Sequence, residues 1–297
     1  MSKPTQTILI TGATAGIGRH AALYLASPGH RVIATGRKEH ALEELALEGH
    51  RMGVTIDTLV LDVTDETSIR QAKADVAELT NGRGLDVLIN NAGYGLAAPA
   101  AEATDADLRH QFDTNVFGLM AVTRAFLPDM IQRGRGRVLN VSSVGGRITF
   151  PMMGPYHASK YAVEALSDAL RLELRPFGVD VVLIEPGPIQ TNFIDRMNQA
   201  ASPYRESSLY APIFERADLI EARTMAMSPG PEVISRAIER AVTARRPRAR
   251  YVAPFASRFM LGLLSWLPTP MRDGLMRAVF GINKKQLAAR PQLAAAA

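Results

Sequence analysis

Short runs of aliphatic and β-branched residues alternate with longer amphipathic segments over residues 7–184, and this alternation limits the fold more than any other feature. The short runs predict strands over residues 7–11, 31–35, 55–61, 86–90, 137–141 and 180–184. Between them, apolar residues spaced three and four apart predict helices. Several runs, such as Val87-Leu88-Ile89, are apolar throughout, as in parallel strands that helices cover on both sides. The sequence therefore predicts an α/β fold, a doubly wound parallel sheet with helices on both faces.

The sequence after residue 186 is less regular. It predicts an irregular lid over residues 188–210, a helix over residues 231–244, a strand over residues 250–253 and an apolar tail of amphipathic helices. The 297 residues are 47% apolar without a low-complexity break, which favours one large core. We therefore expect a single domain over residues 1–254 and a helical C-terminal extension over residues 255–297, frayed at 291–297.

Composition limits the compartment and the partners. The chain has no cysteine, and the residues before the first predicted strand lack the apolar core of a secretory signal. We expect a cytoplasmic protein with no disulfide bond and no metal site. The net charge of +5 reflects arginines late in the chain, and no nucleic-acid motif accompanies them. They are predicted to form a solvated surface, with an anionic ligand or membrane as the alternative: Arg236, Arg240, Arg245, Arg246, Arg248 and Arg250.

The apolar tail has several open interpretations. Its most apolar run, residues 259–267, ends at Pro268 and is too short to span a bilayer. Amphipathic helices in the tail would cover a pocket, pack on another subunit or make peripheral contact with a membrane, in that order of preference.

A glycine-rich loop follows the first predicted strand. Gly12, Gly16 and Gly18 lie between this strand and the first predicted helix, with the spacing Gly-x-x-x-Gly-x-Gly. Glycines allow a tight turn and bring backbone N–H groups close to a pyrophosphate, and the helix N-terminus adds partial positive charge. The loop predicts dinucleotide binding, although a turn that only packs strand on helix has the same pattern.

The end of the second predicted strand indicates which dinucleotide is bound. An acid for the ribose 2′-hydroxyl of NAD is expected about 20 residues past the loop. The strand instead ends in Thr35-Gly36-Arg37-Lys38, where Arg37 would pair with the 2′-phosphate of NADP. We therefore expect NADP(H), with NAD(H) as the alternative. Asp62, after the third strand, is predicted to accept a hydrogen bond from adenine or to cap a helix.

Tyr156 and Lys160 are four residues apart in a predicted helix and so share a face. A free phenol, with a pKa of about 10, transfers protons poorly at neutral pH. A neighbouring ammonium favours the phenolate, so Lys160 is expected to lower the pKa of Tyr156. The pair predicts general acid/base catalysis by the tyrosine.

These motifs in this order resemble the short-chain dehydrogenase/reductase family over about residues 5–192, and the segment Ser143-Val144-Gly145-Gly146 with the long tail resembles its steroid- and retinoid-type members. The resemblance implies a Rossmann-type fold with a cofactor half over about residues 1–142 and a catalytic and substrate part over about residues 143–254. It also implies a homo-oligomer.

The resemblance assigns Tyr156 as catalytic acid/base and Lys160 as a donor to the nicotinamide ribose. Ser143, thirteen residues before the tyrosine, would bind the substrate oxygen, and Asn115 would hold a water near Lys160. Alternation along the strand points the rival Ser142 the other way. The implied cofactor-binding residues are Gly12, Thr14, Gly16, Ile17, Gly18, Arg37, Asp62, Val63, Asn91, Ala92, Gly93, Tyr156, Lys160, Pro186, Gly187, Ile189 and Thr191.

Apolar side chains in the loop over residues 144–153 and in the predicted lid favour a hydrophobic pocket, with core or subunit interface as an equal alternative. Those of the lid are Phe193, Ile194, Met197, Tyr204, Leu209, Tyr210 and Phe214. We expect an NADP(H)-dependent oxidoreductase that interconverts a hydrophobic ketone or aldehyde and its alcohol. The alternatives are a 3-oxoacyl thioester reductase and a non-catalytic nucleotide-sensing regulatory protein.

Overall fold

The computed structural model describes residues 5–287, so the predicted frayed end at 291–297 lies outside the described residues. Seven parallel strands form one sheet in the order β3-β2-β1-β4-β5-β6-β7. The strands are β1 (Thr7–Ile10), β2 (Arg31–Gly36), β3 (Ile56–Val60), β4 (Val87–Asn90), β5 (Gly136–Val141), β6 (Val179–Pro186) and β7 (Arg250–Ala253). All seven predicted strands are confirmed, with ends that differ by no more than two residues.

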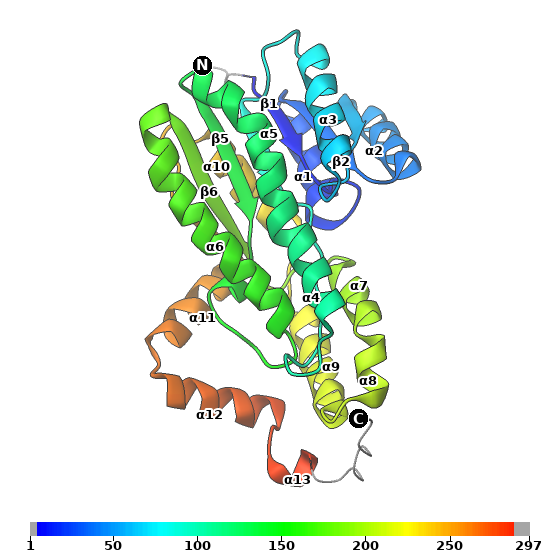
Figure 1. The fold of residues 1–297 in the computed structure, drawn as a ribbon, viewed down its shortest axis with the longest axis vertical. Helices are drawn as coiled ribbons and strands as arrows, with labels where there is room; N and C mark the ends of the chain where they lie inside the picture. Colours follow the sequence, from blue (N-terminus) through cyan, green and yellow to red (C-terminus); the bar gives the residue numbers. More distant parts are fainter. Residues whose placement is uncertain (1–4, 288–297) are drawn as a thin grey trace.

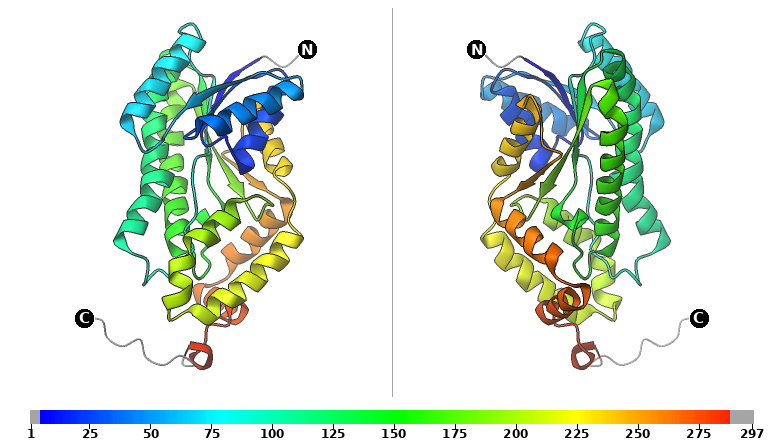
Figure 2. Two further views of the ribbon diagram at one scale, coloured as in Figure 1. Left: turned by 90° about the vertical axis from the view of Figure 1, so that its right-hand side faces the viewer. Right: turned by 90° about the vertical axis from the view of Figure 1, so that its left-hand side faces the viewer.

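Helices cover both faces of the sheet (Figures 1 and 2). On one face, α1 (Gly16–Ala26), α2 (Glu39–Arg51) and α10 (Glu232–Thr243) pack on it through side chains such as Leu25, Leu45 and Ile238. On the other, α3 (Glu66–Leu79), α5 (Leu119–Gln132) and α6 (Gly154–Leu174) do so through side chains such as Phe126 and Leu170. The predicted doubly wound parallel sheet is therefore confirmed. Because both faces are covered, every residue of β4 is buried, which explains its uninterrupted apolar sequence.

The strand order reverses next to β1, which pairs with β2 on one side and β4 on the other. The connections from these strands leave toward opposite faces, so a crevice opens outside their carboxyl ends. The glycine loop follows β1 and residues 91–93 follow β4, so both predicted motifs lie at this crevice.

The prediction of an irregular segment over residues 188–210 is wrong. Most of it is helical, in α7 (Phe193–Ala200) and α8 (Ser202–Ser207), and α9 (Ala211–Ala226) follows. Pro203 and Pro212 lie in the first turns of α8 and α9, where a missing N–H group breaks no helical hydrogen bond. These prolines therefore mark helix starts and not loops.

The predicted helical tail is confirmed as α11 (Phe255–Trp266), α12 (Thr269–Phe280) and the short α13 (Lys284–Leu287). The end of α12 packs against the α7–α9 segment, because Phe280 and Ile282 join the same apolar cluster as Met197 and Phe214. The Phe280 ring also lies 6.5 Å from that of Phe150. Within residues 5–287, no helix combines the length and apolarity needed to cross a bilayer.

Candidate active site

The predicted site residues follow the ends of six strands, β1 to β6, or lie in α1, in α6 or in the segment that contains Asn115, and the strand ends share the carboxyl edge of the sheet (Figure 1). In a parallel sheet, the carboxyl ends of all strands lie along the same edge, so residues that follow these ends lie close together. Residues far apart in the sequence therefore become neighbours: a Cβ added to Gly93 would lie 3.0 Å from Asn115 Oδ1 and 3.8 Å from Lys160 Nζ.

The glycine loop after β1 disfavours side chains at its glycine positions. Gly12 and Gly16 have φ angles of +65° and +54°, a region that disfavours other residues. A Cβ on Gly12 would lie 2.8 Å from Ala92 Cα, and one on Gly36 would lie 2.6 Å from Thr14 Cγ2. The N-terminus of α1 has no side-chain cap, so its N–H groups face the loop. This arrangement fits a pyrophosphate bound against the backbone.

Asn91 and Thr11 hold the glycine loop against the end of β4. Asn91 Nδ2 donates to the carbonyl oxygens of Thr11 and Gly12, at 2.9 and 3.0 Å. In return, Thr11 Oγ1 accepts from the backbone N–H groups of Asn91 and Ala92, both at 3.0 Å. The structure thus brings Gly12, Asn91 and Ala92 together as predicted, and it gives Asn91 a positioning role that the sequence did not indicate.

Arg37, directly after β2, is exposed, and its charge acts on Asp62 after β3. Burial raises the pKa of Asp62, but hydrogen bonds from Thr64 and the Arg37 charge outweigh it, so the pKa is lowered overall. Asp62 Oδ1 accepts from the Thr64 N–H and hydroxyl at 2.9 and 2.7 Å. The N-cap of α3 is Asp65, so Asp62 does not cap this helix. Val63 is buried in the core.

Tyr156, Lys160 and Ser143 lie together at the start of α6. Lys160 Nζ lies 5.9 Å from the centroid of the Tyr156 ring and donates to the Val141 carbonyl oxygen at 2.9 Å. The Ser143 hydroxyl lies next to the Tyr156 phenol; its Oγ accepts from Gly145 N–H at 3.0 Å and donates to the Pro186 carbonyl oxygen at 3.5 Å. Ser142 instead lies against Glu164, so the two serines point apart as strand alternation predicts.

The expected acidic phenol is not observed. Burial raises the pKa of Tyr156 to about 12, and the neighbouring Ser143 hydroxyl only partly opposes this. Burial also lowers the pKa of Lys160 to about 8, although the Glu164 charge raises it. Both groups lie in a low-dielectric site that disfavours their charged forms, and the ammonium points to the Val141 carbonyl. The Tyr156 phenol is therefore protonated at neutral pH.

Asn115 lies in a π-helical segment, η1 (Asp113–Gly118), that joins α4 (Asp105–Phe112) to α5. Its amide closes a bridge to the loop after β4: Oδ1 accepts from Tyr94 N–H at 3.0 Å, and Nδ2 donates to the Tyr94 carbonyl at 2.9 Å and to Ser159 Oγ at 3.0 Å. Such widened turns occur often at functional sites. The Asn115 amide therefore hydrogen-bonds backbone groups of a neighbouring loop and not those of its own helix. These bonds hold the side chain beside Gly93 and Lys160.

The segment after β6 completes the site edge. Thr191 faces the glycine loop, where a Cβ on Gly16 would lie 3.6 Å from Thr191 Cβ. Ile17 and Ile189 pack against the core under the loop. Gly187, which follows Pro186, packs closely against the C-terminal tail. A Cβ at this position would lie 1.8 Å from Ser257 Oγ in α11. The sequence did not indicate that the tail touches this edge.

The apolar residues predicted for the lid mostly pack together. Phe193, Met197 and Phe214 join a cluster with Leu96 and Met152, whereas Leu209 is exposed. The Phe193 ring lies 5.7 Å from that of Tyr156, so this cluster closes over the phenol. The side of Tyr156 that faces Phe193 is apolar, and these side chains pack as a core cluster, the alternative that was equally expected.

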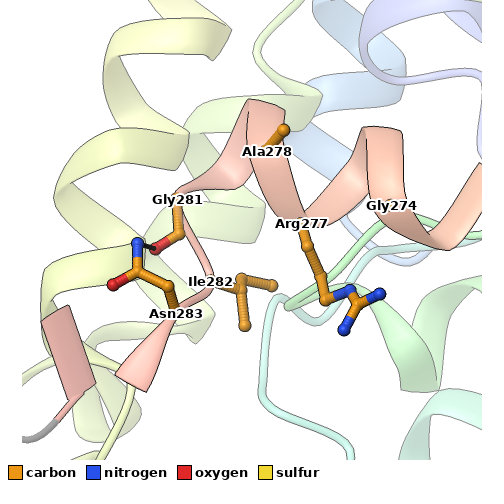
Figure 3. Close-up of a pocket in the computed structure, with 6 residues that line it drawn as sticks. All are labelled: Gly274, Arg277, Ala278, Gly281, Ile282 and Asn283. Carbon is orange, nitrogen blue, oxygen red and sulfur yellow. Dashed lines mark hydrogen bonds between the residues drawn. The ribbon is translucent and has the colours of Figure 1, made fainter. Parts of the chain in front are cut away.

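A hollow of about 290 Å³ lies elsewhere, at the turn between α12 and α13 (Figure 3). Its walls are Gly274, Arg277, Ala278, Gly281, Ile282 and Asn283. None of these is a predicted site residue, and the hollow contributes nothing to the arrangement around Tyr156.

His157 holds the loop that follows Ser143. Phe150 N–H donates to His157 Nδ1 at 3.1 Å, and a Cβ on Gly145 would lie 2.4 Å from His157 Cδ2. Burial lowers the pKa of this histidine to about 4, so it remains a neutral acceptor. No sequence pattern around His157 indicates this role.

A second missed group is a partly buried ionic cluster one helical turn beyond Lys160. Arg250 in β7 contacts Glu164, Asp168 and Glu185 at 3.2, 2.6 and 3.0 Å, and Arg147 contacts Glu185 at 3.3 Å. Arg250 was predicted to be a surface arginine, but it is only partly exposed; Arg236, Arg240, Arg245, Arg246 and Arg248 are exposed. The four-residue spacing of Lys160 and Glu164 was the available signal.

Glu164→Gln should stabilise the protein at high pH. Burial, reinforced by the Glu185 charge, raises the pKa of Glu164 from 4.5 to about 7. Its contribution to stability is therefore full below 4.5 and is lost as the pH rises through about 7. Glutamine does not ionise, so we expect the free energy of unfolding to rise by on the order of 1 kcal/mol above that pH and to be unchanged at the acid end.

Denaturant unfolding across this pH range measures the effect. Asp168→Asn is the matched control, because the pKa of Asp168 is lowered and its loss should destabilise the protein at neutral pH. A Glu164→Gln protein less stable than the wild type at high pH would contradict the argument.

Comparisons with known proteins agree with this geometry. Residues 6–202 match the family described as short chain dehydrogenase. A 3-ketodihydrosphingosine reductase of Bacteroides thetaiotaomicron is 36% identical over 280 residues, which cover 94% of this chain and 99% of that protein. Retinol dehydrogenase 16 of Mus musculus is 36% identical over 283 residues, which cover 91% and 87%.

Among solved structures, a short chain dehydrogenase/reductase from Burkholderia phymatum in complex with NAD is similar with a TM-score of 0.75 and 25% identity. The similarity covers 89% of this chain and 94% of that one. The predicted family is confirmed: this chain belongs to the short-chain dehydrogenase family of oxidoreductases.

Proposed function

We propose that the protein is an NADP(H)-dependent oxidoreductase that interconverts a hydrophobic ketone or aldehyde and its alcohol, with Tyr156 as acid/base. The observation that carries the proposal is the placement of Ser143 and Lys160 next to the Tyr156 phenol, under an apolar cluster. The dinucleotide, when bound, supplies the hydride. The glycine loop would hold the pyrophosphate of the dinucleotide, because its glycines leave the backbone N–H groups uncovered by side chains.

The protein's own contribution is proton transfer and orientation. Because the Tyr156 phenol is protonated at neutral pH, it is ready to donate to a carbonyl oxygen on which negative charge develops. The Ser143 hydroxyl supplies a second donor at the same point. Lys160, anchored by the Val141 carbonyl, would bind the nicotinamide ribose, and Thr191 would contact the carboxamide.

The substrate class follows from the side chains around Tyr156. Phe193 and its neighbours offer aromatic and aliphatic surface, which suits a long-chain or polycyclic carbonyl. The names of the 3-ketodihydrosphingosine reductase and the retinol dehydrogenase support this class, since each denotes a large apolar substrate. We therefore propose a lipid-like carbonyl compound.

An NADPH-consumption screen tests the function. It compares a long-chain 3-ketone, retinal, a steroid ketone and a 3-oxoacyl thioester. We expect turnover of one or more of the first three; a faster rate with the thioester favours the acyl-chain reductase. NADPH binding without turnover of any of them would favour the nucleotide-sensing alternative.

Arg37→Asp tests the cofactor preference. Arg37 is exposed at the end of β2, where a 2′-phosphate would lie, and the loss of charge-assisted hydrogen bonds should weaken NADPH binding by roughly ten- to a hundredfold. NADH binding should change little or improve. Fluorescence titration with both dinucleotides measures the ratio, and Arg51→Asp, at the far end of α2, is the matched control. An unchanged ratio would make Arg37 only a surface charge.

A further inference from the structure

The helix α11 exposes an apolar face to solvent. Phe255, Phe259, Leu263 and Trp266 are 80%, 71%, 57% and 89% exposed, and their spacing places them on one side of the helix. With Arg258 and Gly262 they line a surface groove of about 740 Å³. The opposite side of the helix is packed on the body of the protein, since Leu261 and Leu264 join a buried cluster with Val144 and Ile148. The orientation of α11 is thus set by packing.

The helix α12 continues the same pattern. Met271, Leu275 and Val279 are 60%, 43% and 38% exposed at four-residue spacing. We call the seven exposed apolar residues of α11 and α12 the tail surface: Phe255, Phe259, Leu263, Trp266, Met271, Leu275 and Val279. Both helices lie at one end of the molecule, away from β2 and β3 (Figure 1). Exposed apolar side chains grouped in this way mark an interaction surface.

The charges around the tail surface identify the partner. Between residues 255 and 284, the chain carries Arg258, Arg272, Arg277 and Lys284 against the single acid Asp273. Arg258 lines the groove itself, and Arg277 is also exposed. Large apolar side chains combined with flanking arginines are typical of helices that lie in the interface of an anionic bilayer.

A second copy of the chain fits the tail surface less well. In a two-fold dimer, a surface meets itself, so the arginines of both copies would gather around one axis. Residues 255–284 contain one acid, Asp273, against four basic residues, so most of this positive charge would stay unneutralised. An anionic lipid headgroup layer provides the missing negative charge, and each basic residue near it contributes favourably.

We propose that the tail surface binds an anionic phospholipid bilayer, with α11 and α12 lying along the interface. The end of α12 reaches the cluster that closes over Tyr156, since Phe280 contacts Phe150 and joins Met197 and Phe214. A bilayer bound here lies next to the apolar side of the candidate site. Delivery of a lipid-like substrate from this bilayer rests on the proposed function, whereas the binding itself does not.

The protein carries its own reporter of this binding. Trp266 is the only tryptophan in the chain and is 89% exposed on the tail surface. With vesicles of phosphatidylcholine and phosphatidylglycerol, its emission should shift to shorter wavelength, and the full-length protein should sediment with the vesicles. Phosphatidylcholine alone should produce a weaker response. No shift and no sedimentation with the anionic vesicles would overturn the proposal.

Substitutions locate the contact. Phe259→Ser should weaken vesicle binding by about tenfold, and Arg258→Gln by roughly fivefold with anionic vesicles only. The matched control is Leu172→Ser, which removes a similarly exposed apolar side chain (68%) from α6 and should bind as the wild type does. Equal losses in Phe259→Ser and Leu172→Ser would refute a specific tail surface.

Two further measurements distinguish bilayer binding from self-association, and a failure of this inference from a failure of the proposed function. An emission shift that grows with protein concentration without vesicles, together with a doubled mass in sedimentation, would show that a second copy covers the tail surface and would overturn the proposal. NADPH turnover of a short, water-soluble ketone by Phe259→Ser should equal that of the wild type. Loss of vesicle binding with turnover retained separates a failure of this inference from a failure of the proposed function.

Discussion

Tyr156→Phe should lower kcat for carbonyl reduction by about 10²- to 10⁴-fold, because it removes the proton donor and leaves the rest of the site in place. Tyr156 is 7% exposed, and phenylalanine fills nearly the same volume, so the contact with Phe193 and the fold should survive. NADPH affinity should stay close to that of the wild type. Stopped-flow or steady-state NADPH consumption measures kcat, and fluorescence titration measures binding.

Tyr161→Phe is the matched control. Tyr161 lies in the same helix and is 42% exposed. It makes none of the contacts described for the candidate site, so removal of its hydroxyl should leave kcat unchanged. Wild-type turnover by Tyr156→Phe would remove Tyr156 from the proposed chemistry. A large loss of NADPH binding in the same variant would indicate a structural defect, and kcat would then be measured at saturating NADPH.

Gly18→Ala should nearly abolish dinucleotide binding and also destabilise the fold. A Cβ at this position would lie 2.3 Å from Asn91 Nδ2 and 2.5 Å from the Gly12 carbonyl oxygen. It would break the hydrogen bonds through which Asn91 holds the glycine loop. We expect NADPH affinity to fall by more than about a hundredfold and the free energy of unfolding to fall by about 1–3 kcal/mol.

Gly274→Ala in α12 provides the comparison. No atom lies within 4 Å of a Cβ at that position, so alanine should be neutral or slightly stabilising there. NADPH titration and denaturant unfolding of both variants make the test. If Gly18→Ala bound NADPH as Gly274→Ala does, the close packing between the glycine loop and Asn91 would have no functional consequence.

The candidate site was predictable where local pattern and topology act together. Strand ends that share one sheet edge necessarily bring Gly12, Asn91, Ser143 and Pro186 near one another. Residues four apart on a helix share a face, which placed Lys160 beside Tyr156. The role of Asn115 was implied only by the family resemblance, because a π-helical turn has no simple sequence pattern.

The prediction for the Tyr156 pKa failed for a different reason. Spacing places an ammonium near a phenol, but it does not measure how deeply both are buried. In the structure, burial is the larger effect and raises the pKa of Tyr156 to about 12. A pKa depends on the whole surroundings of a group, including parts of the chain far away in sequence.

The sequence alone determined the parallel sheet, its seven strands, the family and the residues gathered at the sheet edge, because periodicity and motif spacing are local properties. The tertiary structure decided the helical nature of residues 193–207, the ionic cluster that joins Arg250 to Glu164 and the closure of Phe193 over Tyr156. It also decided which side of α11 remains exposed. Apart from the helices of residues 193–207, these features arise from contacts between distant segments, which a local pattern does not identify.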